Sequence, residues 1–381
     1  MKLFDKFKHT GLSSIIKWAG GKEKELPFIF SNALLSFENY YEPFVGGGAV
    51  FTAFPAKRHF INDKSSELIE LYRCIASVNG SFYSWMTIVT DTWQSMLKFV
   101  TKHRCLCEKY VDYRENILSE DEIKILVYDF IENNSDKLNN VLNLKFEWYR
   151  DVYFNELKKN LVRKMVRMKK IEKEKQIMSP NDIYDNIETA FMSALYMYFR
   201  EIYNDKALMK SDSGLGTAMF VFIRNYAYSG MFRYSKKGMF NVPYGGIGYN
   251  HKLLVKKVEY YKSPNLLEHF KTTSICNLDF EDFFRNNPPQ ENDFIFLDPP
   301  YDSEFSTYAQ NVFSRDDQRR LANYLINECK GKWMMIIKNT PFIYSLYNND
   351  KLKIRTFDKK YLVSFMNRNN KKAEHLIIMN Y

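Results

Sequence analysis

The tetrapeptide Asp298-Pro299-Pro300-Tyr301 constrains this chain more than any other feature of its sequence. It follows Phe294-Ile295-Phe296-Leu297, a short apolar run typical of a buried parallel strand. Asp298 is therefore expected at the carboxyl end of a strand, where open α/β sheets bind their ligands. The Asp298 carboxylate and the Pro299 carbonyl make a pair of acceptors for an amino group, and Tyr301 offers a ring for a planar base to stack on. The tetrapeptide thus predicts an α/β fold with a site for an amino-bearing ring.

A glycine-rich segment near the N-terminus predicts a second part of such a site. Gly46-Gly47-Gly48 allows a tight strand-to-helix turn that a ligand can approach closely. Asp63 ends the next apolar run, about 20 residues on, where a carboxylate suits a ribose hydroxyl. Phe51 stands where a dinucleotide fingerprint has its third glycine, so that fingerprint is absent. Glu42 and Asp63 favour a ligand with an amine and a ribose but no phosphate, such as S-adenosylmethionine.

The chain of 381 residues is long enough for one α/β core and a second, smaller domain. The pattern of residues 13–75 predicts a βαβ unit, with a helix from Ala49 and another helix beginning at Ser65-Ser66. From about residue 80 to 215 the apolar residues recur with helical periodicity, with a break at Pro180. These patterns predict an α/β sheet interrupted by a helical region.

The composition points to a polyanionic partner. The net charge is +10 and aromatic residues make up 17% of the chain, so basic and stacking side chains are both abundant. The five cysteines give no disulfide framework, and Cys105 and Cys107 have poor spacing for a metal, so we expect reduced thiols and no metal. No apolar stretch approaches membrane-spanning length, which predicts a soluble, cytoplasmic protein.

Two basic segments are candidates for nucleic-acid contact. Residues 157–170 form an amphipathic basic helix, which is either a solvated face or a phosphate-contacting surface. Residues 224–245 alternate aromatic and basic side chains around Lys237-Gly238, which predicts a β-hairpin with a basic turn, or one that only buttresses the cleft.

With these residues in view, the chain resembles the Dam-type (alpha-group) DNA adenine-N6 methyltransferases. Lys17 to Lys22 is similar to the family's K-W-A-G-G-K, and Glu42 to Phe51 to its E-P-F-x-G-G-G-x-V-F turn. Asn62-Asp63 and Leu278-Asp279-Phe280 resemble two further cofactor elements, and Asp298 to Tyr301 resembles the catalytic D-P-P-Y. The similarity covers roughly residues 13–75 and 224–381, including the last strand, whereas the middle third departs from the compact members.

The resemblance implies a function for each of these segments. Asp298, Pro299, Pro300 and Tyr301 would be catalytic, without a metal or a cysteine nucleophile. S-adenosylmethionine would be bound by Trp18, Lys22, Glu42, Phe44, Gly46, Gly48, Asp63, Asp279, Phe280 and Asp298. Double-stranded DNA would be contacted by Tyr228, Ser229, Met231, Arg233, Lys236, Lys237 and Pro243.

Within the last set, Arg233 matches an arginine that reads a guanine, and Pro243 a residue packed against a thymine methyl. Tyr228 and Ser229 match a Tyr-Asn pair that contacts phosphate and fills the space left by a flipped base. Ser229 and Met231 differ from the commonest family residues, so the expected site is GATC or a relaxed version of it.

The resemblance also implies the architecture and the partners. We expect a Rossmann-like S-adenosylmethionine-dependent methyltransferase fold with an inserted, mostly helical DNA-recognition domain that carries a β-hairpin. The catalytic domain would comprise residues 1–79 and 261–381, and the insertion residues 80–260. We expect a monomer, with a cognate restriction endonuclease as a candidate partner. Alternatives are a cytosine-N4 methyltransferase, which usually has Ser in place of Asp298, an enzyme acting on RNA or free adenine, and a catalytically silent DNA-binding regulator.

Overall fold

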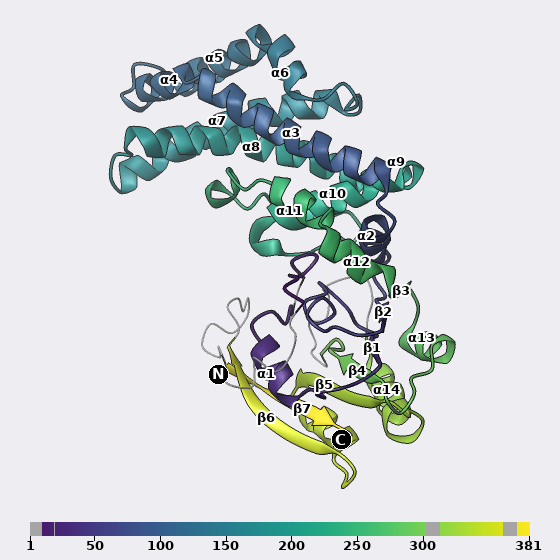
Figure 1. The fold of residues 1–381 in the computed structure, drawn as a ribbon. Coiled ribbons are helices and arrows are strands. Elements are labelled where there is room, and N and C mark those ends of the chain that lie inside the picture. The colour runs from purple at the N-terminus through teal and green to yellow at the C-terminus, as the bar shows by residue number, and fades with distance from the viewer. Residues whose placement is uncertain (1–9, 19, 302–312, 361–371) are drawn as a thin grey trace. The chain divides into compact units, whose positions relative to one another are not determined.

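The computed structural model describes residues 10–18, 20–301, 313–360 and 372–381 (Figure 1). The chain divides into two compact units. Met1–Ser77 and Tyr261–Tyr381 together form the first, which we call the sheet unit, and Val78–Tyr260 forms the second, the helical unit. Neither unit, within the described residues, has a helix long and apolar enough to cross a membrane.

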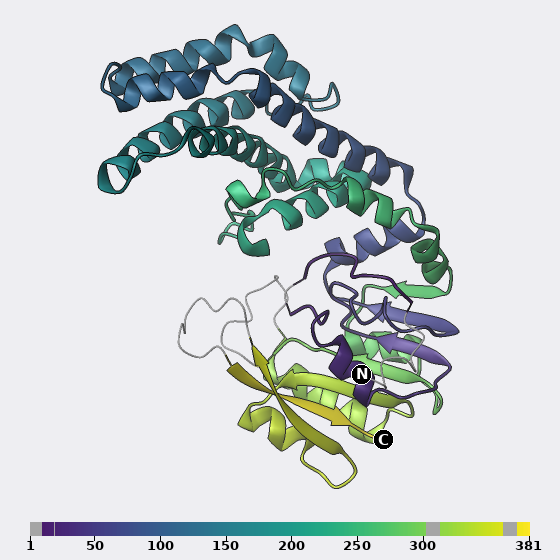
Figure 2. The same ribbon diagram turned by 60° about the vertical axis from the view of Figure 1, so that its left-hand side comes forward.

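The sheet unit is built on a seven-stranded sheet with the order β3-β2-β1-β4-β5-β7-β6. All neighbouring strands pair in parallel except β7, which is antiparallel to both β5 and β6 (Figures 1 and 2). The strands are β1 (Asn39–Glu42), β2 (Arg58–Asn62), β3 (Thr273–Cys276), β4 (Phe294–Leu297), β5 (Lys332–Lys338), β6 (Lys353–Lys360) and β7 (Lys372–Met379). This mostly parallel sheet is consistent with the expected Rossmann-like methyltransferase fold.

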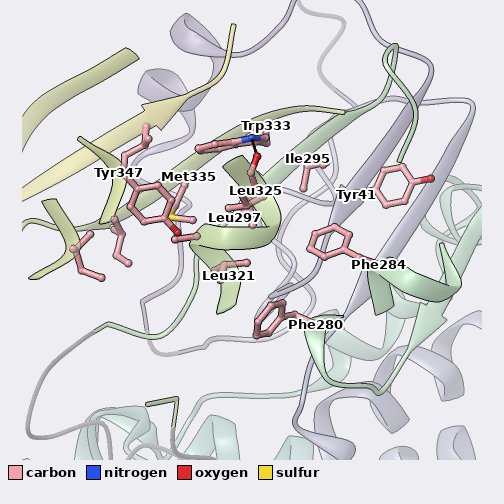
Figure 3. Close-up of a cluster of buried hydrophobic side chains, with 14 of the residues drawn as sticks. Tyr41, Phe280, Phe284, Ile295, Leu297, Leu321, Leu325, Trp333, Met335 and Tyr347 are labelled. Atoms are coloured by element: carbon pink, nitrogen blue, oxygen red, sulfur yellow. Dashed lines mark hydrogen bonds between the residues drawn. The ribbon is translucent and has the colours of Figure 1, made fainter. Parts of the chain in front are cut away.

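Alternating side chains of the central strands build two separate cores. Tyr41 of β1 faces the cluster shown in Figure 3, in which Ile295 and Leu297 of β4 and Trp333 of β5 are fully buried. Tyr40 faces the opposite way and stacks on Phe54. The helices of this unit are α1 (Leu26–Asn32), α2 (Ser66–Ala76), α12 (Pro264–Lys271), α13 (Phe280–Asn286), α14 (Arg315–Asn327) and α15 (Pro341–Tyr347), with α11 (Val255–Tyr261) leading back into it. Both faces of the central strands are thus buried, as a parallel sheet requires.

One expected helix is wrong. Residues 49–53 form only turns, although Thr52 N–H donates to the Gly48 carbonyl at 2.9 Å, as it would in a helix. Pro55 explains the early end, because a proline lacks an N–H and disfavours helical backbone in the residue before it. The helix expected at Ser65-Ser66 is confirmed: Ser65 is the N-cap of α2 and accepts from the Leu68 N–H.

The helical unit contains α3 (Gly80–Lys102), α4 (Cys105–Arg114), α5 (Glu120–Asn133), α6 (Ser135–Val141), α7 (Arg150–Glu174), α8 (Pro180–Asn204), α9 (Lys206–Ser211) and α10 (Ser213–Tyr226). The long helices α7 and α8 lie side by side in Figures 1 and 2. Between them, Ser179 caps α8 in a capping box with Asp182, and Pro180 occupies the first turn. The expected break at Pro180 and the expected basic helix, which lies within α7, are both confirmed.

After α10 the chain forms two arms that pair antiparallel around a turn at residues 235–238, as an irregular version of the expected β-hairpin. The arms are joined by two isolated antiparallel bridges, Ala227 with Tyr244 and Tyr234 with Phe240. Short 3-10 turns stand at η2 (Tyr228–Gly230) and η3 (Ile247–Tyr249). The expected hairpin is therefore present only in part, because the η2 turn in the first arm interrupts the ladder between the two bridges.

Candidate active site

The expected catalytic and cofactor residues converge where the strand order of the sheet reverses. β1 lies between β2 and β4, so the chain leaves β1 toward one side of the sheet and later returns to its other side. Such a switch point leaves a crevice at the carboxyl ends of the two central strands. Glu42 is the last residue of β1, and Asp298 directly follows β4. The prediction that Asp298 stands at a strand end is confirmed.

Asp298 forms an ion pair with Lys22, a residue 276 positions earlier in the chain. The Lys22 side chain is only 3% exposed, whereas that of Asp298 is 20% exposed. The Lys22 ammonium also donates to the Gly20 carbonyl at 2.9 Å and to the Tyr301 hydroxyl at 3.4 Å. Lys22 therefore holds both ends of the tetrapeptide and supplies the charge that balances Asp298.

The second proline of the tetrapeptide is fixed from α14. The buried side chain of Gln318 donates from Nε2 to the Pro300 carbonyl at 2.7 Å. The ring of Tyr301 meets that of His375 on β7 edge-on, with centroids 5.4 Å apart. Gln318 thus fixes the Pro300 carbonyl, and the expected role of the Pro299 carbonyl as an acceptor for substrate stays a prediction.

The glycine turn is packed tightly against the segment that carries Trp18. Ile15 N–H donates to the Gly47 carbonyl at 2.9 Å. A Cβ added at Gly47 would lie 2.4 Å from the Ile16 carbonyl oxygen, and one at Gly46 would lie 3.0 Å from Cδ1 of Trp18. Only glycine allows this approach.

Two carboxylates flank the turn. Each oxygen of the half-buried Asp63 accepts a backbone N–H: Oδ2 from Gly46 at 3.0 Å, Oδ1 from Ser65 at 2.9 Å. Burial raises the pKa of Asp63, and these two N–H groups lower it. Glu42 is 2% exposed and accepts from the Tyr40 hydroxyl at 2.7 Å. Burial raises the pKa of Glu42 well above its usual range, against the Tyr40 hydroxyl, which lowers it.

Asn62 ties the ends of three strands together, a role that its sequence position did not indicate. Its buried amide donates to the carbonyls of Pro43 and Leu278, both at 3.1 Å, and accepts from the Leu278 N–H at 2.8 Å. These bonds link the end of β2 to the loops that follow β1 and β3. A polar residue at the end of an apolar run was the only available signal.

The Asp279-Phe280 element also lies beside the strand ends. Asp279 is the N-cap of α13, and both of its oxygens lie 3.4 Å from the guanidinium of Arg320. Phe280 is 3% exposed, with the Arg320 guanidinium 4.8 Å from its ring centroid and the Phe44 ring 6.0 Å away. The pair is therefore held by packing and charge, and its contact with a cofactor stays a prediction.

The residues expected to read DNA lie in the helical unit. Tyr228, Ser229, Arg233, Lys236, Lys237 and Pro243 are exposed, and Met231 is half-buried. Ser229 has a φ of +53°, a left-handed conformation that is unusual for serine. Arg233 donates from Nε to Oδ1 of Asn241 at 2.8 Å.

The basic helix presents a narrower cationic face than the sequence indicated. Lys159, Arg163, Arg167 and Lys170 are exposed at spacings that place them on one side of α7. Lys159 pairs with Glu156 at 3.1 Å and Lys170 with Glu174 at 4.0 Å within the helix, and the half-buried Lys158 pairs with Glu132 at 2.9 Å. Burial lowers the pKa of the half-buried Lys164, with Arg167 and Arg163 adding to the effect.

Comparison with known proteins identifies the family. The model of the D12 class N6 adenine-specific DNA methyltransferases matches residues 18–179 and 151–363. The Type II methyltransferase M.CviBI of Paramecium bursaria Chlorella virus NC1A is 37% identical over 167 residues, which are 42% of this chain and 60% of the relative. M.MjaIII of Methanocaldococcus jannaschii is 24% identical over 380 residues, 96% of this chain and 98% of the relative. The retron Ec67 DNA adenine methylase of Escherichia coli is 34% identical over 132 residues, 34% of this chain and 44% of the relative. The chain belongs to the D12 class of N6 adenine-specific DNA methyltransferases.

Proposed function

We propose that this protein transfers a methyl group from S-adenosylmethionine to the N6 amino group of an adenine in double-stranded DNA, at GATC or a related site. The observation that carries the proposal is the Lys22–Asp298 ion pair at the carboxyl ends of β1 and β4, beside the glycine turn. It brings together the acceptor for an amino group and the expected cofactor turn.

The residues at the turn fit S-adenosylmethionine. Asp63 uses one acceptor position on each oxygen for the backbone, and a carboxylate has further lone pairs for ribose hydroxyls. Trp18 and Glu42 would line the methionine end. When bound, the cofactor supplies an already activated methyl group, so the protein needs mainly to position the acceptor.

Asp298 and the Pro299 carbonyl would accept the two hydrogen bonds of the adenine N6 amino group. The N6 lone pair of adenine is delocalised into the ring and is a poor nucleophile. Acceptance of both N–H bonds draws this nitrogen toward tetrahedral geometry and stabilises the positive charge that develops on it. Because N6 is hidden in a duplex, the adenine must be flipped out, at a cost of a few kcal/mol. Tyr301 would stack on the flipped ring.

The direct test is to incubate the purified protein with unmethylated DNA and S-adenosylmethionine, and to sequence the product with modified-base detection. We expect N6-methyladenine at one adenine of a short site, and unmodified DNA when the cofactor is omitted. N4-methylcytosine as the product, or unmodified DNA in the complete reaction, would overturn the proposal.

Cofactor binding should depend on Asp63 and require no added metal. Asp63→Ala removes both the expected ribose acceptor and the bond that fixes Gly46, and we expect affinity for S-adenosylhomocysteine to fall by about 10-fold or more. Calorimetry measures this directly. Asp316→Ala is the matched control, since Asp316 is an 85% exposed carboxylate of the same unit. A preference of the wild-type protein for nicotinamide dinucleotides would contradict the assignment.

The exposed face of α7 should contact DNA phosphates. Charge reversal of Arg163, Arg167 and Lys170 should weaken DNA binding and reduce the slope of log K against log salt by about 2–3, with sequence preference little changed. The matched control reverses Lys98, Lys124 and Lys137, exposed lysines of α3, α5 and α6, for the same change in net charge. Equal slopes for the two triple variants would show that α7 is only a solvated face.

A further inference from the structure

The second arm of the recognition segment is held by helix α8. The amide side chain of Asn204 pairs with the backbone of Phe240 in both directions: Phe240 N–H donates to Oδ1 at 2.7 Å, and Nδ2 donates to the Phe240 carbonyl at 3.1 Å. The Tyr196 hydroxyl donates to the Val242 carbonyl at 3.0 Å, and Arg200 does so at 3.4 Å. Residues 196, 200 and 204 lie four apart, on one face of α8, and together take the place of a neighbouring strand.

Aromatic packing fixes the same point of the arm. Phe240 is 1% exposed, and its ring lies 5.1 Å from that of Phe232 and 5.8 Å from those of Tyr203 and Tyr234. The backbone on either side of Phe240 is therefore anchored by both its hydrogen bonds and its side chain. The anchored backbone of Phe240 therefore also restricts the position of the next residue, Asn241.

Asn241 in turn holds the guanidinium of Arg233. Arg233 Nε donates to Oδ1 of Asn241 at 2.8 Å, and Nη2 lies 3.4 Å from the Asn241 carbonyl oxygen. The Asn241 N–H donates to the Arg233 carbonyl at 3.1 Å, so the two residues face each other across the arms. Arg233 is exposed although its guanidinium is held in this way.

This arrangement suits a reading arginine. A guanidinium has five N–H donors, and Asn241 engages the Nε edge and one Nη2 position. Reading O6 and N7 of guanine takes two donors at the outer end of the group. A long side chain that is already ordered loses less rotamer entropy when it binds than a freely moving one.

We propose that Asn241 is a positioning residue for base recognition, which orients Arg233 toward a guanine and is itself kept in place by Asn204 of α8. The inference rests on the proposed function. It also gives part of the helical unit a role: α8 sets the geometry of the segment that reads DNA.

The test is a double-mutant cycle on sequence discrimination. The variants are Asn241→Ala, Asn241→Asp, Arg233→Ala and the double variant Arg233→Ala/Asn241→Ala. For each, kcat/KM is measured on duplexes with the preferred site and with each base pair of that site replaced in turn. Asn140→Ala, at an exposed position of α6, is the matched control, and thermal unfolding of every variant reports on the fold.

We expect Arg233→Ala to relax discrimination at one guanine position by about 5- to 150-fold. Asn241→Ala should relax it at the same position by about 3- to 10-fold, the range for one hydrogen bond, while turnover on the substituted duplex is unchanged. Asn241→Asp should retain discrimination because a carboxylate oxygen also accepts from Nε. In the Arg233→Ala background, Asn241→Ala should have no further effect.

The contrary results are distinct from one another. Equal loss on all duplexes, or additive effects in the double variant, would make Asn241 a phosphate-contacting or structural residue and would overturn the inference alone. Discrimination that does not depend on Arg233 would overturn the inference and leave the methyltransferase assignment standing. Absence of methylation by the wild-type protein on every duplex would overturn both.

Discussion

Asp298→Asn is expected to lower methyl transfer to duplex DNA by about 1,000-fold, with the fold retained. The substitution keeps the volume of the side chain but removes the negative charge that would stabilise the reacting amino group. Turnover is measured with radiolabelled S-adenosylmethionine, and the fold by thermal unfolding. Near-normal turnover would contradict the catalytic assignment. The exposed carboxylate variant Asp316→Ala serves as the control and should behave as the wild type.

Asp298→Ala should in addition destabilise the protein, because it leaves the buried Lys22 ammonium without its counter-charge. We expect a loss of about 1–3 kcal/mol in the free energy of unfolding, the usual penalty for a buried polar group that loses its partner. The companion variant Lys22→Met/Asp298→Ala removes both charges and should regain part of that stability without regaining turnover. Recovery of stability in the double variant would show that the loss in Asp298→Ala comes from the unpaired Lys22 charge.

Gly48→Ala should strongly destabilise the cofactor turn. Gly48 has a φ of +75°, and an added Cβ would lie 2.4 Å from the Tyr72 hydroxyl oxygen. Tyr72 is fully buried, and its hydroxyl donates to the Gly46 carbonyl at 2.9 Å. The Tyr72 side chain therefore cannot move away from the added Cβ. Left-handed backbone and steric overlap together should cost about 2–4 kcal/mol. Chemical denaturation measures this loss, and calorimetry should show weaker cofactor binding.

Three matched variants separate these two causes. Gly11 has a similar φ of +74°, and nothing lies within 4 Å of a Cβ added there. Gly11→Ala should therefore lose only the free energy that left-handed backbone costs an alanine. Gly80→Ala has neither problem and should be neutral. Tyr72→Phe removes the hydroxyl oxygen, so Gly48→Ala should be less damaging in that background. Equal effects of Gly48→Ala and Gly11→Ala would rule out the steric cause.

Sequence reasoning succeeded where the controlling signal is local. The apolar run before Asp298 marks β4, and Ser65-Ser66 marks the start of α2, because caps and strand patterns depend on neighbouring residues. The helix expected from Ala49 does not form, because Pro55 follows the glycine turn too closely for a helix to extend. In this case too, the residue that decides the local structure, Pro55, is close to Ala49 in the chain.

What could not be predicted depends on residues far apart in the chain. Nothing near Lys22 indicates that it pairs with Asp298, and nothing near Asn62 indicates that it bonds the backbone of Leu278. The support of the hairpin segment could not be predicted for the same reason. Its aromatic and basic alternation is local, whereas the Asn204 side chain that bonds the backbone of Phe240 comes from a helix earlier in the chain.

The strand order also governs when each unit can fold during synthesis. β1 pairs with β4, yet Tyr40 and Phe294, which lie opposite each other, are separated by most of the chain. The centre of the sheet therefore cannot close until the ribosome has made the entire helical unit and β3 and β4 as well. The helical unit is one continuous segment whose contacts become available much sooner. Until β4 emerges, β1 lacks its neighbour on one side. This open edge exposes the nascent chain to mispairing and aggregation.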